Sequence, residues 1–188
     1  MLHLEDEEIL RLYKARNEAA ITETVNKYSR YCRSITLNIL GSEEDADEAL
    51  NDTWLAAWNA IPPHDPETLS TFLGKIARRV ALNKWRASQT AKRGRGQTAL
   101  ALEELAEILP DRETVDDGLI ADELSTALGR FLSTLPDTER RVFLCRYWYL
   151  DSIDQICFIH RFTPSKVNSM LHRTRNKLRN YLKQEGLL

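Results

Sequence analysis

Residues 152–182 read SIDQICFIHRFTPSKVNSMLHRTRNKLRNYL, and this stretch decides the fold of the C-terminal part of the chain. Its first nine residues predict a short helix with apolar side chains on one face. Thr163 has the side-chain oxygen of a helix N-cap, and Pro164 follows in the first-turn position that proline tolerates best. Only Arg161 and Phe162 separate the two helices. A short helix, a tight turn and a longer helix are therefore predicted.

The longer helix divides into two faces at about 100° per residue. One face is largely apolar: Val167, Met170, Leu171, Thr174, Leu178 and Leu182. The other face is polar and basic: Ser165, Asn168, Ser169, His172, Arg173, Asn176 and Arg179. Because arginine bonds phosphate or guanine and asparagine can pair with adenine, this layout is typical of a helix that reads the major groove. A basic surface helix in a bundle would show the same pattern, and that alternative stays open.

The formal net charge of −2 over 188 residues conceals an uneven distribution. Residues 71–97 carry eight basic and no acidic groups, and residues 138–188 carry ten basic and four acidic groups. The intervening residues 98–137 carry ten acidic and two basic groups. Two basic blocks on predicted helices favour contact with a polyanion, although a solvated surface can carry such blocks too.

The composition excludes several classes of protein. With 43% hydrophobic and 29% charged residues, the chain is neither a disordered tail nor a collagen-like fibre. No stretch approaches the ~18 apolar residues of a membrane-spanning helix, and the acidic start lacks the order of a signal peptide. Cys32, Cys145 and Cys157 form no close pair, so neither a disulfide framework nor a zinc site is predicted. We expect a cytoplasmic protein without metal or cofactor.

The first half of the chain has helical periodicity throughout and no strand alternation. It predicts helices at about 5–16, 21–40, 42–61 and 71–87. Gly41 is expected to end the second helix in a left-handed conformation, and Ser42 to cap the third. A proline pair at the start of the loop 62–69 stops the third helix, and Ser70 is expected to cap the fourth.

We therefore expect an all-α fold of two small helical domains. Residues 1–87 form the first domain, 88–117 a flexible acidic linker with some helical tendency, and 118–188 the second domain. The linker is predicted because the apolar period breaks down after Ser88. Helical order returns near Asp116, and a further helix is expected to begin after Pro136.

The helix predicted at 71–87 combines cations with a tryptophan. Four cations gather in one sector: Lys75, Arg78, Arg79 and Arg86. Trp85 lies at the edge of this sector and Asn83 on its other flank. Cations hold a nucleic-acid backbone and an aromatic ring stacks on bases, so the helix suits single-stranded or unstacking nucleic acid. Trp85 as an ordinary core side chain is an equally open alternative.

The helix predicted at 42–61 is acidic, with Asp45, Asp47, Glu48 and Asp52 near its start. These carboxylates would repel phosphate, so its tryptophans are core or partner contacts rather than contacts to nucleic acid. An acidic amphipathic surface suggests a basic protein partner.

Together these segments resemble bacterial sigma factors of the extracytoplasmic-function (ECF) type, the small two-domain branch of the sigma-70 family. DADEALNDTWLAAW (45–58) is similar to the family's region 2.2, and FLGKIARRVALN (72–83) to its regions 2.3 and 2.4. Leu135-Pro136 through Tyr147 and the helix around Leu171-His172-Arg173 look like region 4. The likeness covers about residues 8–87 and 118–182.

The resemblance implies a transcription initiation factor that binds core RNA polymerase and recognises promoter DNA. The expected contacts to the clamp helices of the polymerase β′ subunit are Asp47, Glu48, Asn51, Asp52 and Trp58. The expected contacts to the melted −10 element are Lys75, Arg78, Arg79, Asn83, Lys84, Trp85 and Arg86, with 62–69 as the loop that receives a flipped base. The expected contacts to the duplex −35 element are Lys166, Asn168, Ser169, His172, Arg173 and Arg175.

The resemblance also implies contact with the polymerase β flap, an anti-sigma protein as a further partner, and a linker that threads toward the polymerase active-site cleft. The sequence departs from the family pattern at several positions: Arg79, Asp151, Asn168 and Met170 replace residues usual there, and Leu150 and Arg161 stand where glycine is common. Arg161 predicts a wider turn between the two helices.

Two other functions compete with this interpretation. A stand-alone helix-turn-helix regulator would explain the C-terminal half, but not the acidic and basic helices of the first half. An enzyme has little support, since the sequence has no glycine-rich phosphate loop, HExxH or GxSxG motif and its four histidines are scattered.

Overall fold

The computed structural model describes residues 4–89, 97–109 and 118–188. These residues contain helices and no strand, so the all-α expectation is confirmed for them. The helices are α1 (Asp6–Lys14), α2 (Ala19–Leu40), α3 (Glu43–Ala60), α4 (Leu69–Gln89), α5 (Gln97–Ala106), α6 (Gly118–Thr134), α7 (Asp137–Tyr147), α8 (Ile153–His160) and α9 (Pro164–Gln184). Within the described residues no helix is both long and apolar enough to cross a membrane.

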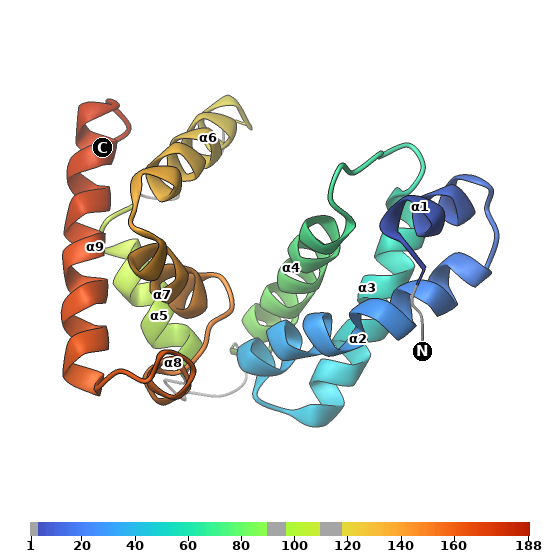
Figure 1. Ribbon diagram of the computed structural model, residues 1–188, viewed down its shortest axis with the longest axis horizontal. Helices are drawn as coiled ribbons and strands as arrows, with labels where there is room; N and C mark the ends of the chain where they lie inside the picture. The colour runs from blue at the N-terminus through green and yellow to red at the C-terminus, as the bar shows by residue number, and fades with distance from the viewer. Residues whose placement is uncertain (1–3, 90–96, 110–117) are drawn as a thin grey trace. The chain divides into compact units, whose positions relative to one another are not determined.

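The chain forms two compact units, Met1–Gly94 and Arg95–Leu188. In unit 1, α2, α3 and α4 pack on one another and α1 packs on α2 (Figure 1). The core gathers apolar residues from all four helices: Ile9, Tyr13, Cys32, Leu50, Trp54, Ala57, Leu73 and Ile76. Gly74 lets α4 approach α2 closely, because a Cβ there would lie 2.5 Å from the Tyr31 hydroxyl oxygen.

The ends of the helices in unit 1 follow the sequence in most places. Gly41 closes α2 with a left-handed φ of 70°, and the Ser42 hydroxyl accepts a hydrogen bond of 3.3 Å from the Asp45 amide, as predicted. The prediction that Ser70 caps α4 is wrong. The helix begins at Leu69, which is fully buried, and Ser70 is already its second residue.

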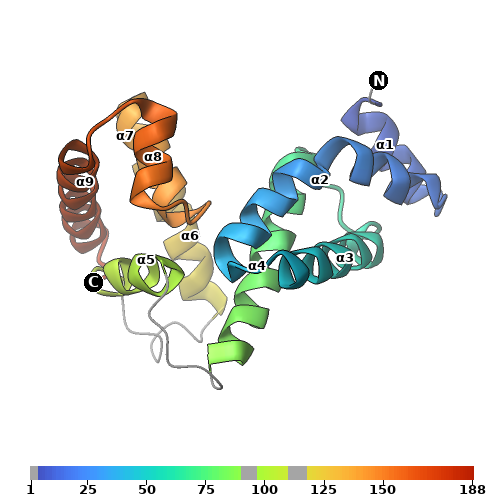
Figure 2. The same cartoon turned by 90° about the horizontal axis from the view of Figure 1, so that it is seen from below.

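Unit 2 contains α5 to α9, with α9 in contact with α6, α7 and α8 (Figure 2). Its core includes Phe131, whose ring lies 6.5 Å from Phe143 and 5.6 Å from Tyr181 between ring centroids. The predicted apolar face of α9 is confirmed, since all its members are buried: Val167, Met170, Leu171, Thr174, Leu178 and Leu182.

The helix-turn-helix of unit 2 has the predicted caps. Ser152 forms a reciprocal capping box with Gln155, and the Thr163 hydroxyl accepts from the Lys166 amide at 3.3 Å. Arg161 does not widen the turn. It takes the left-handed conformation that glycine would take, with φ 53°, and the Phe162 amide donates to the Cys157 carbonyl at 3.1 Å.

In the loop before α8, Leu150 also stands where glycine is common, and it too takes the left-handed conformation. Leu150 has a φ of 57°, so both positions where the family commonly has glycine are left-handed here. A non-glycine residue in this conformation costs roughly 1–2 kcal/mol. Leu150 is 2% exposed, so burial of its side chain offsets this cost.

The stretch 88–117, which was expected to be a linker, contains a helix, α5. α4 continues to Gln89. α5 contacts α7, and Ala101 of α5 and Ile108 in the turn after it are buried. Residues 90–96 and 110–117 lie outside the described residues. The division into 1–87, 88–117 and 118–188 stays a prediction, but within it α5 packs as part of unit 2 rather than as a free segment.

Candidate functional site

The exposed face of α3 has acidic and amide side chains. Asp47, Glu48, Asn51 and Asp52 are all exposed, as the sequence predicts. Asp47 accepts a hydrogen bond of 2.9 Å from the Arg33 side chain on α2, so its charge is partly neutralised within the unit. Among the described residues, no hydrogen bond or ion pair is found at the side chains of Asn51 and Asp52.

Leu55 extends this face and escaped the sequence analysis. Leu55 is 59% exposed. It lies three residues after Asp52 and four after Asn51, so the three side chains share one side of the helix. This spacing was the signal in the sequence from which Leu55 could have been assigned to the face. The face therefore combines a carboxylate, an amide and an apolar group.

The basic side chains of α4 form a stripe. Lys75, Arg79, Asn83 and Arg86 are exposed and follow spacings of four, four and three residues. This spacing keeps all four on one side of the helix. Arg78 and Trp85 are partly buried at the border of the stripe. Burial and the nearby Arg86 cation lower the pKa of Arg78 to about 10, so it stays protonated at neutral pH.

Lys84 lies on the opposite side of α4 and faces α3. Its ammonium group is 3.2 Å from the Asp45 carboxylate and also donates to Glu48. Burial lowers the pKa of Lys84, but its hydrogen bonds to Glu48 and Asp45 raise the pKa by more. The pKa of Lys84 therefore lies above its ordinary value. Lys84 was expected among the contacts to DNA, but it does not join the stripe.

The outer face of α9 presents five of the six predicted side chains. Lys166, Asn168, Ser169, His172 and Arg173 are exposed on the N-terminal half of the helix. The His172 Nε2 lies 3.1 Å from the Asn176 side-chain nitrogen, and the Lys166 ammonium lies 3.5 Å from the centre of the Phe162 ring. In a recognition helix, the side chains of the N-terminal half contact the edges of the DNA bases.

Among the described residues, no group of three or more His, Cys, Asp and Glu side chains is placed to hold a metal ion. Burial raises the pKa of the Cys32 and Cys145 thiols to about 12. The thiolate is the reactive form of cysteine, so these two side chains are poor nucleophiles at neutral pH. The exposed faces of α3, α4 and α9 therefore act through charge and hydrogen bonding.

Residues 24–91, which span most of α2 and all of α3 and α4, match the family model described as Sigma-70 region 2. A curated relative, the ECF RNA polymerase sigma factor SigW of Bacillus subtilis (strain 168), is 23% identical over 177 residues, 93% of this chain and 95% of its own length. These two matches support an ECF sigma factor of the sigma-70 family.

A solved structure is also similar to this chain. Its title is "Structure of CnrH in complex with the cytosolic domain of CnrY". The two chains are 21% identical, the likeness covers 95% of this chain and 97% of the other, and the TM-score is 0.41.

Two further residues among the expected contacts, Trp58 and Arg175, also pack within their own units. Trp58 is half-buried: its ring lies 6.0 Å from the Tyr13 ring and 5.1 Å from the Arg16 guanidinium carbon. Arg16 also donates to the Trp58 carbonyl at 2.6 Å, at the C-terminal end of α3. Cations bond the free carbonyls of helix ends in this way. Trp58 thus packs α1 against α3 and offers only part of its surface.

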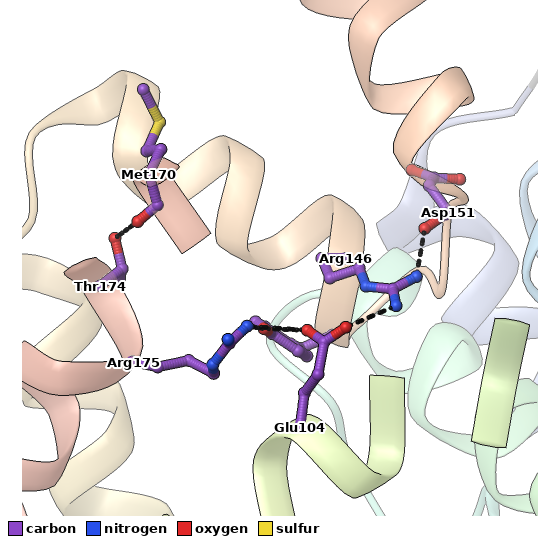
Figure 3. A network of polar contacts seen from close by, with 7 residues as sticks. Glu104, Arg146, Asp151, Met170, Thr174 and Arg175 are labelled. Carbon is purple, nitrogen blue, oxygen red and sulfur yellow. Dashed lines mark hydrogen bonds and ion pairs between the residues drawn. The ribbon is translucent and has the colours of Figure 1, made fainter. Parts of the chain in front are cut away.

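Arg175 is the second such residue, and it does not lie on the outer face of α9. Its guanidinium donates to Glu104 at 2.8 Å and to the Tyr147 hydroxyl at 2.6 Å, and its side chain is 18% exposed. Figure 3 shows the Glu104 carboxylate between Arg175 and Arg146. The sequence analysis missed Glu104, because it lies in the stretch interpreted as a linker and its partners are far away in the chain.

Proposed function

We propose that this sigma factor binds core RNA polymerase through α3 and directs it to promoters that it recognises through α4 and α9. The observation that carries the proposal is the segregation of charge in unit 1. An acidic, partly apolar face on α3 and a basic stripe on α4 belong to one rigid helical core. One unit can therefore hold a protein and a nucleic acid at the same time.

The α3 face suits a basic protein surface. Asn51, Asp52 and Leu55 offer a hydrogen-bonding group, a charge and an apolar contact side by side, so the face can make both the apolar contacts of an interface core and the polar contacts of its rim. The name of the SigW relative supports RNA polymerase as this partner. We assign the clamp helices of the β′ subunit as the docking site and, for unit 2, the β flap. Membership of the family also supports an anti-sigma protein as a partner.

The α4 stripe suits the melted −10 element. Lys75, Arg79 and Arg86 supply positive charge along one side of the helix, and the partly exposed Trp85 supplies a ring on which a base can stack. The loop 62–69 precedes the stripe and is the proposed receptor of a flipped base. Lys84 is left out of this set because of its bonds to α3.

The α9 face suits duplex DNA of the −35 element. Asn168 can make paired hydrogen bonds to adenine and Arg173 to guanine, while Lys166 reaches phosphate. A protein that works in this way is a binding protein and not an enzyme, and it acts in the cytoplasm with its polymerase.

Run-off transcription with bacterial core polymerase and a pool of random promoter DNA tests the proposal. The wild-type chain should give promoter-specific transcripts, and Asp52→Arg should abolish them. The control is Glu7→Arg, which makes the same change of charge at an exposed position of α1. Transcripts that survive Asp52→Arg would remove α3 from the polymerase interface. Tight duplex binding by the chain alone, with no transcripts, would establish a stand-alone regulator instead.

A further inference from the structure

We propose that Glu104 is a positioning residue for promoter recognition, which makes α5 an integral part of the DNA-reading unit. The inference rests on the proposed function of α9. It assigns a role to a helix that lies in the stretch expected as a linker. Glu104 itself is not a DNA contact, and it acts through Arg175 and Tyr147.

Glu104 receives hydrogen bonds from two other helices. One carboxylate oxygen accepts from Arg146 at 2.8 Å, and the other accepts from the Tyr147 hydroxyl at 2.7 Å and from Arg175 at 2.8 Å. Arg146 and Tyr147 belong to α7, and Arg175 belongs to α9. One side chain of α5 therefore joins α7 to the recognition helix (Figure 3).

The charge of Glu104 pairs with a buried cation. Arg146 is 2% exposed, and its guanidinium also donates to the Asp151 carbonyl at 3.4 Å. A buried guanidinium without a counter-ion is strongly unfavourable. Burial raises the pKa of Glu104, but its bonds to Arg146 and Tyr147 lower it by more, so the net pKa lies below the ordinary value.

The sequence of α5 places Glu104 where it can make these bonds. Ala101 and Ile108 are buried, and Glu104 lies between them at helical spacing on the same side. Glu103 and Glu107 are exposed. One carboxylate of an acidic helix is thus built into its docking face, and its neighbours face solvent.

The bond to Arg175 fixes the orientation of α9. Thr174, the preceding residue, is buried and its hydroxyl donates to the Met170 carbonyl at 2.9 Å, within the apolar face. Arg175 adds a lateral attachment beside that face. A rotation of α9 by about 20° would move side-chain atoms ~6 Å from its axis by about 2 Å, more than base-specific hydrogen bonds tolerate.

Glu104→Gln tests the inference, because the amide nitrogen cannot accept a hydrogen bond and one of the attachments is lost. Glu103→Gln is the matched control, with the same loss of charge at the adjacent exposed position. Each full-length variant is combined with core polymerase. Its binding to a labelled duplex with the −35 element recovered by transcription is compared with binding to a scrambled duplex at one salt concentration. Circular dichroism verifies that each variant is folded at the assay temperature.

We expect Glu104→Gln to lower the ratio of the two affinities about 5- to 10-fold, and Glu103→Gln less than ~2-fold. A purely structural role would lower stability and leave this ratio unchanged in the folded protein. Equal ratios for the two variants would overturn the inference and leave the proposed function intact. A wild-type chain that does not discriminate the two duplexes would overturn both.

Arg175→Gln gives a second test that leaves the Glu104–Arg146 bond in place. We expect most of the same loss of discrimination, and little further loss when both substitutions are combined, because the two residues act through one contact. If Arg175 binds phosphate instead, the substitution weakens binding to both duplexes equally and adds to the effect of Glu104→Gln. That result would overturn the inference even if Glu104→Gln were too unstable to study.

Discussion

The ammonium nitrogen of Lys84 lies 3.2 Å from a carboxylate oxygen of Asp45, and this ion pair ties the basic helix α4 to the acidic helix α3. Glu48 accepts a second hydrogen bond from the same group. A cation that sequence alone assigns to DNA binding thus belongs to the contact between two helices. The position of a charge around the helix, and not its presence in a basic segment, decides its role.

Lys84→Met and Arg79→Met should therefore behave differently. Arg79 lies on the exposed stripe, so its loss should reduce the salt dependence of binding to single-stranded −10 DNA by about 0.7 in log–log slope. Lys84→Met should leave this slope unchanged and lower the free energy of unfolding by about 0.5 kcal/mol, as for an ion pair near solvent. Salt titrations of the holoenzyme and urea unfolding of the free chain measure the two effects. Equal slopes for the two variants would contradict this division.

Leu55→Ala and Trp58→Ala should also separate binding from stability. Leu55 is exposed, so its truncation should weaken binding to core polymerase about fivefold, with little change in melting temperature. Trp58→Ala removes packing against Tyr13 and Arg16 and should cost roughly 2 kcal/mol, less than the 3–5 for a fully buried aromatic. Pull-down titration and thermal melting distinguish them. A Trp58→Ala variant with wild-type stability would return this residue to the polymerase interface.

The stability of unit 2 should depend on pH through Glu104. Its pKa is lowered in the folded state, so its contribution is fully present above the ordinary value of 4.5 and is lost as the pH falls through the folded value. Urea unfolding of the wild-type chain from pH 7 downward should show this loss. Glu104→Gln should show a smaller slope below pH 4.5 than Glu103→Gln. Identical slopes would mean that the carboxylate titrates normally.

Arg161→Gly should stabilise unit 2 by about 0.5 kcal/mol. It removes left-handed strain of roughly 1–2 kcal/mol and adds back about 0.5–1 kcal/mol of chain entropy in the unfolded state. Leu150→Gly relieves the same strain but exposes a cavity in place of a buried side chain, so it should destabilise. Thermal melting of the two variants tests the contrast. A loss of stability with Arg161→Gly would show that its side chain contributes more than the strain costs.

The sequence predicts local structure here because each helix carries its own signals. The faces of α9, the cap at Thr163 and the stop at Gly41 depend on residues within a few positions of one another. Ser70 failed as a cap because α4 begins two residues earlier than expected, at the buried Leu69. Lys84 could have been separated from the proposed DNA contacts, since its position around the helix is opposite Arg79 and Arg86.

The contacts of Glu104 could not be predicted, because they join residues 42, 43 and 71 positions apart. An acidic helix between two basic segments is typical of a solvated linker, and the sequence does not show which of its carboxylates meets a cation on another helix. Arg175 was wrongly assigned to the outer face of α9 for the same reason. The sequence places it near the polar face of α9, but it does not show the distant carboxylate of Glu104 that Arg175 bonds.

The docking of α5 on α7 also decides where the chain can be divided. A fragment that begins at residue 118 would contain Arg146 and Arg175 without their carboxylate, whereas one that begins at residue 95 keeps all three groups. If unit 2, the proposed DNA-reading unit, were exchanged with that of a similar sigma factor, α5 would have to be transferred together with the helix-turn-helix. The segment that looks like a spacer in the sequence would then belong to the same evolutionary unit as the helix-turn-helix.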